Sequence, residues 1–113
     1  MTSQLGLDET DVATLIAILQ KHDEVEEACI FGSRAKGNFK HGSDVDVALK
    51  GSLVTQDVVT SISYELNEET LMPYRFDVLN FSTISSKELM EHIARVGVTI
   101  YKRRSRMSEL SEK

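Results

Sequence analysis

A glycine and a serine directly follow a short apolar run. Gly32 and Ser33 come immediately after residues 28–31. Glycine lets a ligand approach the backbone closely because it has no Cβ, and serine adds a hydroxyl donor. If a helix begins at Ser33, its unpaired N–H groups also face an anion, and Arg34 and Lys36 add positive charge. These residues could therefore hold phosphate, although a Gly-Ser pair taken alone is a weak signal and is more typical of an ordinary turn.

Two aspartates follow the Gly-Ser pair, separated from Ser33 by ten residues. Asp44 and Asp46 alternate with Val45 and Val47, which predicts a strand whose apolar face is buried. Side chains two residues apart on a strand point to the same face, so the two carboxylates repel each other unless a cation lies between them. Mg²⁺ takes one or two carboxylates together with substrate phosphates and water. The pattern fits a metal-bound nucleotide, but an edge strand with its polar face in water would look the same.

A third carboxylate lies in a later apolar segment. Asp77 stands between two apolar residues of the predicted strand 76–81. If this strand pairs beside the one that carries Asp44 and Asp46, Asp77 joins them as a metal ligand or general base. Three carboxylates around metal ions are the arrangement for phosphoryl or nucleotidyl transfer. The alternative is a strand-end aspartate without a catalytic role.

Helices and strands alternate around these residues. Apolar residues recur at helical spacing in some segments, and alternate or run together in others. Helices are predicted over about 8–22, 33–36, 55–69 and 85–97, and strands over 28–31, 45–49, 76–81 and 98–101. Ser85 and Glu88 form the capping box that predicts the start of the last helix. This order predicts an α/β (α+β) domain in which helices pack on a small mixed β-sheet.

The chain length and the two ends suggest one domain with tails. A total of 113 residues favours a single domain, predicted over residues 1–103. Within it, residues 1–7 are expected to form a loose tail. The polar stretch 104–113 is expected to be disordered. The basic run 102–106 is interpreted as solvated, with contact to an acidic partner or RNA as the alternative.

Composition narrows the classes of function. A net charge of −5 argues against a dedicated nucleic-acid binder, because phosphate backbones call for a basic surface. No apolar run approaches the roughly 20 residues that span a bilayer, and the N-terminus does not resemble a signal peptide. A cytoplasmic location without membrane partners is therefore predicted. The histidines are scattered over separate elements without metal-ligand spacing; they are His22, His41 and His92.

The joint spacing of these residues resembles a known signature. Gly32-Ser33, ten residues and Asp44-Val45-Asp46 match the nucleotidyltransferase signature of the DNA polymerase β superfamily. The local sequence Phe-Gly-Ser-Arg-Ala-Lys-Gly is similar to that of the minimal nucleotidyltransferases of bacteria and archaea, the MNT or MntA-like proteins. Asp77 falls where that family carries its third strand aspartate. The resemblance covers nearly the whole chain and implies a polymerase β-like nucleotidyltransferase fold over residues 1–103.

The resemblance also implies a role for each residue. In this superfamily the Gly-Ser element holds the triphosphate, and the three aspartates bind two Mg²⁺ ions. The reaction moves a nucleoside monophosphate to a hydroxyl and releases pyrophosphate. The implied residues are Gly32, Ser33, Arg34 and Lys36 for the nucleotide, and Asp44, Asp46 and Asp77 for metal binding and catalysis.

The resemblance further implies a protein partner. Minimal nucleotidyltransferases are commonly encoded beside a HEPN-domain toxin, an RNase, and act as its antitoxin by transferring AMP from ATP to a tyrosine of the toxin. Two alternatives stay open. The chain could be a non-catalytic antitoxin that occludes the toxin, or an aminoglycoside-type enzyme with a small-molecule acceptor. Whether the chain forms homo- or hetero-oligomers is also open.

Overall fold

The computed structural model of the chain describes residues 5–37, 40 and 42–103. Helices and strands alternate along it as predicted. They are α1 (Glu9–Gln20), β1 (Glu27–Phe31), α2 (Ser33–Lys36), β2 (Val45–Lys50), α3 (Gln56–Glu68), β3 (Phe76–Asn80), the 3₁₀ turn η2 (Phe81–Thr83), α4 (Lys87–Val96) and β4 (Val98–Lys102). The tail predicted over 104–113 lies outside the described residues, as does His41. None of the helices in the described residues combines the length and the apolar character that a membrane-spanning segment requires.

The strands form a mixed sheet, which confirms the predicted fold class. Their order is β3-β2-β1-β4. β1 pairs antiparallel with both β2 and β4, whereas β2 and β3 pair in parallel. A parallel pair needs a long crossover between its strands, and α3 supplies it. The carboxylate-bearing strands are therefore neighbours, with β3 at the edge of the sheet.

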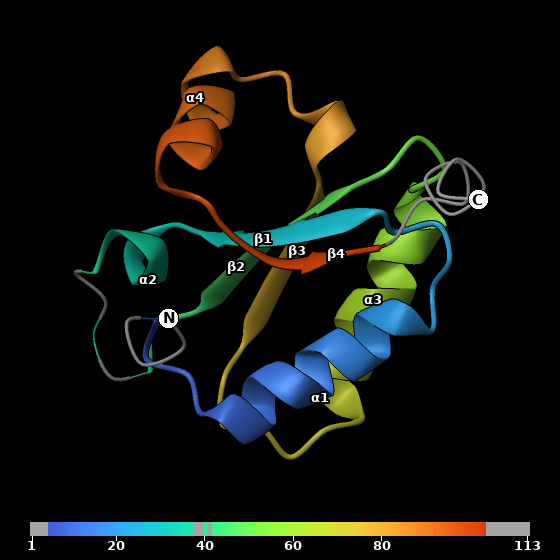
Figure 1. Ribbon diagram of the computed structural model, residues 1–113, viewed down its shortest axis with the longest axis vertical. Helices are drawn as coiled ribbons and strands as arrows, with labels where there is room; N and C mark the ends of the chain where they lie inside the picture. The colour runs from blue at the N-terminus through green and yellow to red at the C-terminus, as the bar shows by residue number, and fades with distance from the viewer. Residues whose placement is uncertain (1–4, 38–39, 41, 104–113) are drawn as a thin grey trace, which may run out of the picture.

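Helices cover both faces of the sheet. Figure 1 shows α1 and α3 packed on one face and α4 on the other. Alternate residues of β2 divide between the two: Val45, Val47 and Leu49 join the larger core with α1 and α3, whereas Ala48 joins a smaller cluster with Ile93 of α4. Because side chains alternate along a strand, Asp46 lies on the α4 face.

The expectation of a loose N-terminal tail is wrong for residues 5–7. Leu5 and Leu7 are 2% and 5% exposed and belong to the larger core. The Leu5 carbonyl also accepts a hydrogen bond from Arg34. The hydrophobic effect draws these two leucines inward although their neighbours are polar. Residues 1–4 lie outside the described part of the chain.

The last long helix begins one residue later than its capping box predicts. Ser86, not Ser85, is the N-cap residue, and its hydroxyl accepts a hydrogen bond from the Leu89 N–H. The turn η2, which the sequence pattern does not indicate, precedes it. Buried Asn80 closes this turn by accepting from the Ser82 N–H and donating to the Val54 carbonyl. A side chain that satisfies distant backbone groups leaves no periodic signal in the sequence.

Candidate active site

Strand register places two of the three aspartates side by side. Asp46 of β2 is the register partner of Asp77 of β3 in the parallel pair. On its other side Asp46 lies opposite Phe31, the last residue of β1. Gly32 follows Phe31 directly, so the Gly-Ser turn and the two strand aspartates meet at one end of the sheet. Asp44 stands just before β2, on the approach to the same end.

Gly32 approaches the Asp46 carboxylate so closely that no other residue fits. Its φ of 77° and ψ of −153° lie in a region that is essentially restricted to glycine. A Cβ added here would overlap Oδ2 of Asp46. The glycine predicted to admit phosphate therefore also admits the aspartate of the neighbouring strand.

His92 reaches the site from α4 and was not among the predicted site residues. The Gly32 N–H donates a hydrogen bond to Nε2 of His92 at 3.2 Å. The imidazole also packs edge-on against the Phe31 ring, with centroids 6.2 Å apart. An accepting Nε2 belongs to the neutral tautomer that carries its proton on Nδ1. Sixty residues separate the two partners, so no local spacing could have revealed this contact.

The site disfavours a negative charge on Asp46. Partial burial raises the pKa of its carboxyl, and the nearby charges of Asp77 and Asp44 raise it further. Each cause is one that a bound cation would offset, because a cation stabilises neighbouring carboxylates in their charged form.

The donor set fits a divalent cation whose coordination shell is completed by the substrate. Among the described residues, no three His, Cys, Asp or Glu side chains are arranged to hold a metal ion by themselves. Mg²⁺ in nucleotide sites usually takes one or two carboxylates and fills its other positions with phosphate oxygens and water. Asp46 is half-buried, while Asp44 and Asp77 are exposed. The carboxylates thus fit an Mg²⁺ ion that also binds a triphosphate better than they fit an ion coordinated by the protein alone.

The remaining predicted nucleotide contacts lie in and beside α2. Ser33 begins this single turn next to Gly32, and Lys36 ends it with an exposed side chain. Arg34 differs, because it is 3% exposed. Its N–H groups donate to the carbonyls of Ser43 and Leu5. The guanidinium predicted to meet phosphate is therefore engaged inside the protein.

Comparison with known proteins identifies the family. The family model described as "Polymerase beta, Nucleotidyltransferase" matches residues 13–106. The chain belongs to this family. The chain is also 32% identical over 102 residues to MntA of Haemophilus influenzae, a probable protein adenylyltransferase, and the match covers 88% of the chain and 89% of that protein. It is thus a nucleotidyltransferase enzyme.

Solved structures share the fold. A chain of a toxin–antitoxin structure with AMP-PNP superposes with a TM-score of 0.66 and 17% identity, covering 92% of this chain and 80% of that one. A chain from the complex of tri-AMPylated Shewanella oneidensis HEPN toxin with MNT antitoxin has a TM-score of 0.64 and 14% identity, covering 90% of this chain and 77% of that one. At such identities the likeness shows the fold alone.

Proposed function

We propose that this enzyme is an Mg²⁺-dependent adenylyltransferase that moves AMP from ATP to the hydroxyl of a tyrosine side chain on a HEPN-domain toxin. The transfer would silence the toxin, so the enzyme would act as an antitoxin. The observation that carries the proposal is the meeting of Gly32, Asp46 and Asp77 at one end of the sheet. The similarity to MntA along most of both chains supports protein adenylylation as the reaction.

The chain's own groups have distinct proposed roles. The turn at Gly32 would admit the triphosphate, the Ser33 hydroxyl would hold it, and Lys36 would neutralise part of its charge. Asp44, Asp46 and Asp77 would hold Mg²⁺. When bound, Mg²⁺ would supply charge neutralisation at the phosphates and would favour ionisation of the attacking hydroxyl.

Group transfer then requires one bond to form and one to break. The acceptor oxygen bonds to the α-phosphorus, the bond from that phosphorus to pyrophosphate breaks, and the hydroxyl proton passes to a carboxylate oxygen. Asp77 is the proposed base. It lies on the edge strand β3 and is exposed, so a hydroxyl from another protein can reach it. Asp46 is flanked by strands on both sides and is less accessible.

Solved relatives support the partner and the nucleotide. One structure of the same fold is a toxin–antitoxin with AMP-PNP, and another is an AMPylated HEPN toxin in complex with its MNT antitoxin. ATP as the substrate and a HEPN protein as the acceptor are accordingly the proposals for this chain.

A labelling experiment tests the proposed function. The enzyme is incubated with labelled ATP, Mg²⁺ and the HEPN protein encoded beside it, and label is expected on the HEPN protein. Asp44→Asn should reduce labelling strongly, whereas Asp57→Asn, an exposed position at the start of α3, should leave it unchanged. Equal labelling by Asp44→Asn would contradict the metal assignment. Full neutralisation of the toxin by the double variant Asp44→Asn, Asp46→Asn would instead favour occlusion without catalysis.

A further inference from the structure

Arg34 is a charged side chain in the protein interior. Only 3% of its surface is exposed. Among the polar residues of the described chain, Asn80 is the other one that is buried. A buried charge is costly unless its hydrogen-bonding groups find partners. The Arg34 guanidinium meets this demand with backbone carbonyls and an aromatic ring, so its position is closely determined.

The partners of Arg34 belong to three separate segments. Nη1 donates to the Leu5 carbonyl at 2.9 Å and to the Gly6 carbonyl at 3.3 Å. Nε and Nη2 donate together to the Ser43 carbonyl, at 3.2 and 2.8 Å. The guanidinium also lies over the Tyr74 ring, 5.1 Å from its centroid. One side chain thus ties α2 to the N-terminal segment, the segment before β2 and the segment before β3.

The contact with Ser43 bears directly on the site. The Ser43 carbonyl belongs to the peptide that links Ser43 to Asp44, and two donors hold it from one planar group. Ser43 is held from its other side as well, because its hydroxyl accepts from the Lys40 N–H and its N–H donates to the Lys40 carbonyl. The peptide on the other side of Asp44 is held as well, because the Val45 N–H donates to the Arg75 carbonyl. Two held peptide planes determine the direction in which the Asp44 side chain leaves the backbone.

We infer that Arg34 is a positioning residue that holds the Ser43–Asp44 peptide, and through it directs the Asp44 carboxylate toward the site, rather than a phosphate contact. The inference rests on the proposed function, because it assigns Asp44 to the metal site. Arg34 and Ser33 are adjacent, so one short helix carries the proposed triphosphate contact and the group that directs a metal ligand. Lysine cannot replace this group, since its point charge does not form the planar fork that holds one carbonyl twice.

Two readouts on the full chain test the inference. The first is the backbone order parameter of the Asp44 amide, measured by ¹⁵N NMR relaxation without metal or nucleotide. In Arg34→Lys it should fall from about 0.85 to below about 0.6, while that of Asp46 inside β2 stays high. The second is steady-state kinetics of AMP transfer to the HEPN protein. Arg34→Lys should lower kcat at least tenfold and change KM for ATP little, as expected when support of a metal ligand is lost (about 10–100-fold).

Matched variants separate positioning from phosphate binding. Lys36→Met on the same helix removes an exposed proposed phosphate contact, so it should raise KM for ATP and leave the Asp44 amide rigid. Lys102→Met removes a charge at the opposite end of the sheet and should change neither readout. If Arg34→Lys does not fold, Tyr74→Leu removes the ring beside the guanidinium and should produce a smaller change of the same sign.

The outcomes that overturn the inference are distinct from those that overturn the proposed function. A folded Arg34→Lys with a rigid Asp44 amide, or with an unchanged kcat, overturns the positioning role. A rise in KM for ATP alone identifies Arg34 as a phosphate contact and also overturns it. If the wild-type enzyme transfers no AMP to the HEPN protein, the proposed function fails, and the NMR readout alone decides whether Arg34 holds the Ser43–Asp44 peptide.

Discussion

Two demands require glycine at position 32: one is the backbone conformation, and the other is the lack of space for a Cβ. The positive φ of Gly32 requires a residue without a Cβ, and the Asp46 carboxylate occupies the space that a Cβ would need. Gly37, with φ of 84°, meets only the first demand, because no atom of the described residues lies within 4 Å of the place a Cβ would take. The pair of glycines therefore separates strain from crowding at the site.

Gly32→Ala should abolish most AMP transfer and lower the free energy of unfolding. The strained backbone alone is expected to cost about 1–3 kcal/mol, and displacement of Asp46 adds to the loss of activity. Gly37→Ala should have a comparable backbone cost or less and keep its transfer activity. Urea denaturation and the labelling assay measure the two effects. A Gly32→Ala enzyme with wild-type transfer would show that the Asp46 carboxylate need not lie where the structure places it.

Asp46 should make the metal-free protein less stable at neutral pH. Burial and the charges of Asp77 and Asp44 raise the pKa of its carboxyl in the folded state above the ordinary 3.8. A raised folded pKa contributes stability that is present below pH 3.8 and is lost as the pH rises through the folded value. Asp46→Asn should therefore raise the free energy of unfolding at pH 7, and this gain should vanish as the pH falls toward 3.8.

Urea denaturation of both proteins at pH 7 and at pH 4, in the presence of a chelator, tests this expectation. Asp57→Asn, an exposed position, should show no comparable gain at either pH. A less stable Asp46→Asn at pH 7 would mean that the charged carboxylate is stabilised by contacts stronger than its burial and its acidic neighbours.

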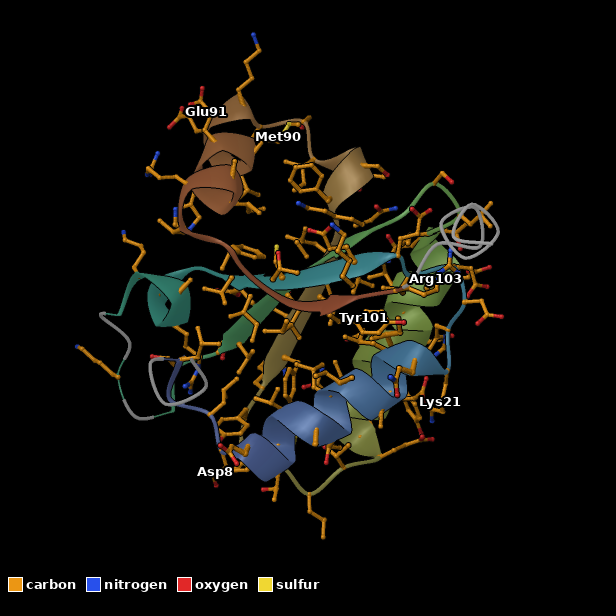
Figure 2. All side chains as sticks on the ribbon, viewed as in Figure 1. Asp8, Lys21, Met90, Glu91, Tyr101 and Arg103 are labelled. Atoms are coloured by element: carbon orange, nitrogen blue, oxygen red, sulfur yellow. The ribbon has the colours of Figure 1, made fainter. Side chains whose placement is uncertain are left out.

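At the scale of elements, α4 connects the smaller core to the Gly-Ser turn. Ile93 is its buried residue and packs with Phe31, Ala48 and Cys29. The preceding residue, His92, accepts the Gly32 N–H. Glu91 lies on the outer side of the helix, away from the sheet (Figure 2). Three consecutive residues of α4 therefore have different roles: Ile93 anchors the helix, His92 orients the Gly-Ser turn and Glu91 faces solvent.

His92→Phe should weaken the Gly-Ser turn while it keeps an aromatic ring against Phe31. Loss of the acceptor leaves the Gly32 N–H without its partner and should lower the free energy of unfolding by about 1 kcal/mol. We expect a fall in kcat/KM for AMP transfer as well. His92→Gln offers an acceptor at a similar distance and should recover most of both losses, and Glu91→Gln serves as the exposed neighbour control. Equal activity of the Phe and Gln variants would exclude a role for the acceptor.

At the scale of the whole molecule, an ion pair joins the two helices that cover the larger core. Lys21, at the end of α1, and His22 both contact Glu65 of α3 at 2.6 Å. Burial acts to raise the pKa of Glu65, but hydrogen bonds from Lys21 and His22 outweigh it and hold the pKa below its ordinary value of 4.5. This pair lies on the face opposite α4, so it contributes to the fold without touching the site.

Glu65→Gln should lower the free energy of unfolding at pH 7 by about 1 kcal/mol, a modest figure because the pair is partly exposed. A depressed folded pKa contributes stability above pH 4.5 that is lost as the pH falls through the folded value. The difference from wild type should therefore shrink under acid conditions, as chemical denaturation at pH 7 and pH 3.5 can measure. Glu68→Gln, exposed on the same helix, is the control for stability. Both variants should transfer AMP as well as the wild type does.

The local features of this protein follow from short stretches of its sequence. Periodic apolar residues predicted the helices and strands of the mixed sheet, and the spacing from Gly32-Ser33 to Asp44 and Asp46 predicted the family that the comparison identified. Such patterns are visible because neighbouring residues in one helix or strand share its geometry. A long-range contact outweighs the local pattern at Leu5 and Leu7, which are buried in the larger core.

Which distant groups meet depends on the three-dimensional packing of the chain. The parallel pairing of β2 with β3 places Asp77 beside Asp46, and the return of α4 over the sheet brings His92 to Gly32. The same packing buries Arg34 against carbonyls 9 and 29 residues away. Contacts of this kind depend on how the sheet is ordered and which face each helix covers, and these are decided by the burial of the whole core rather than by any short stretch of residues.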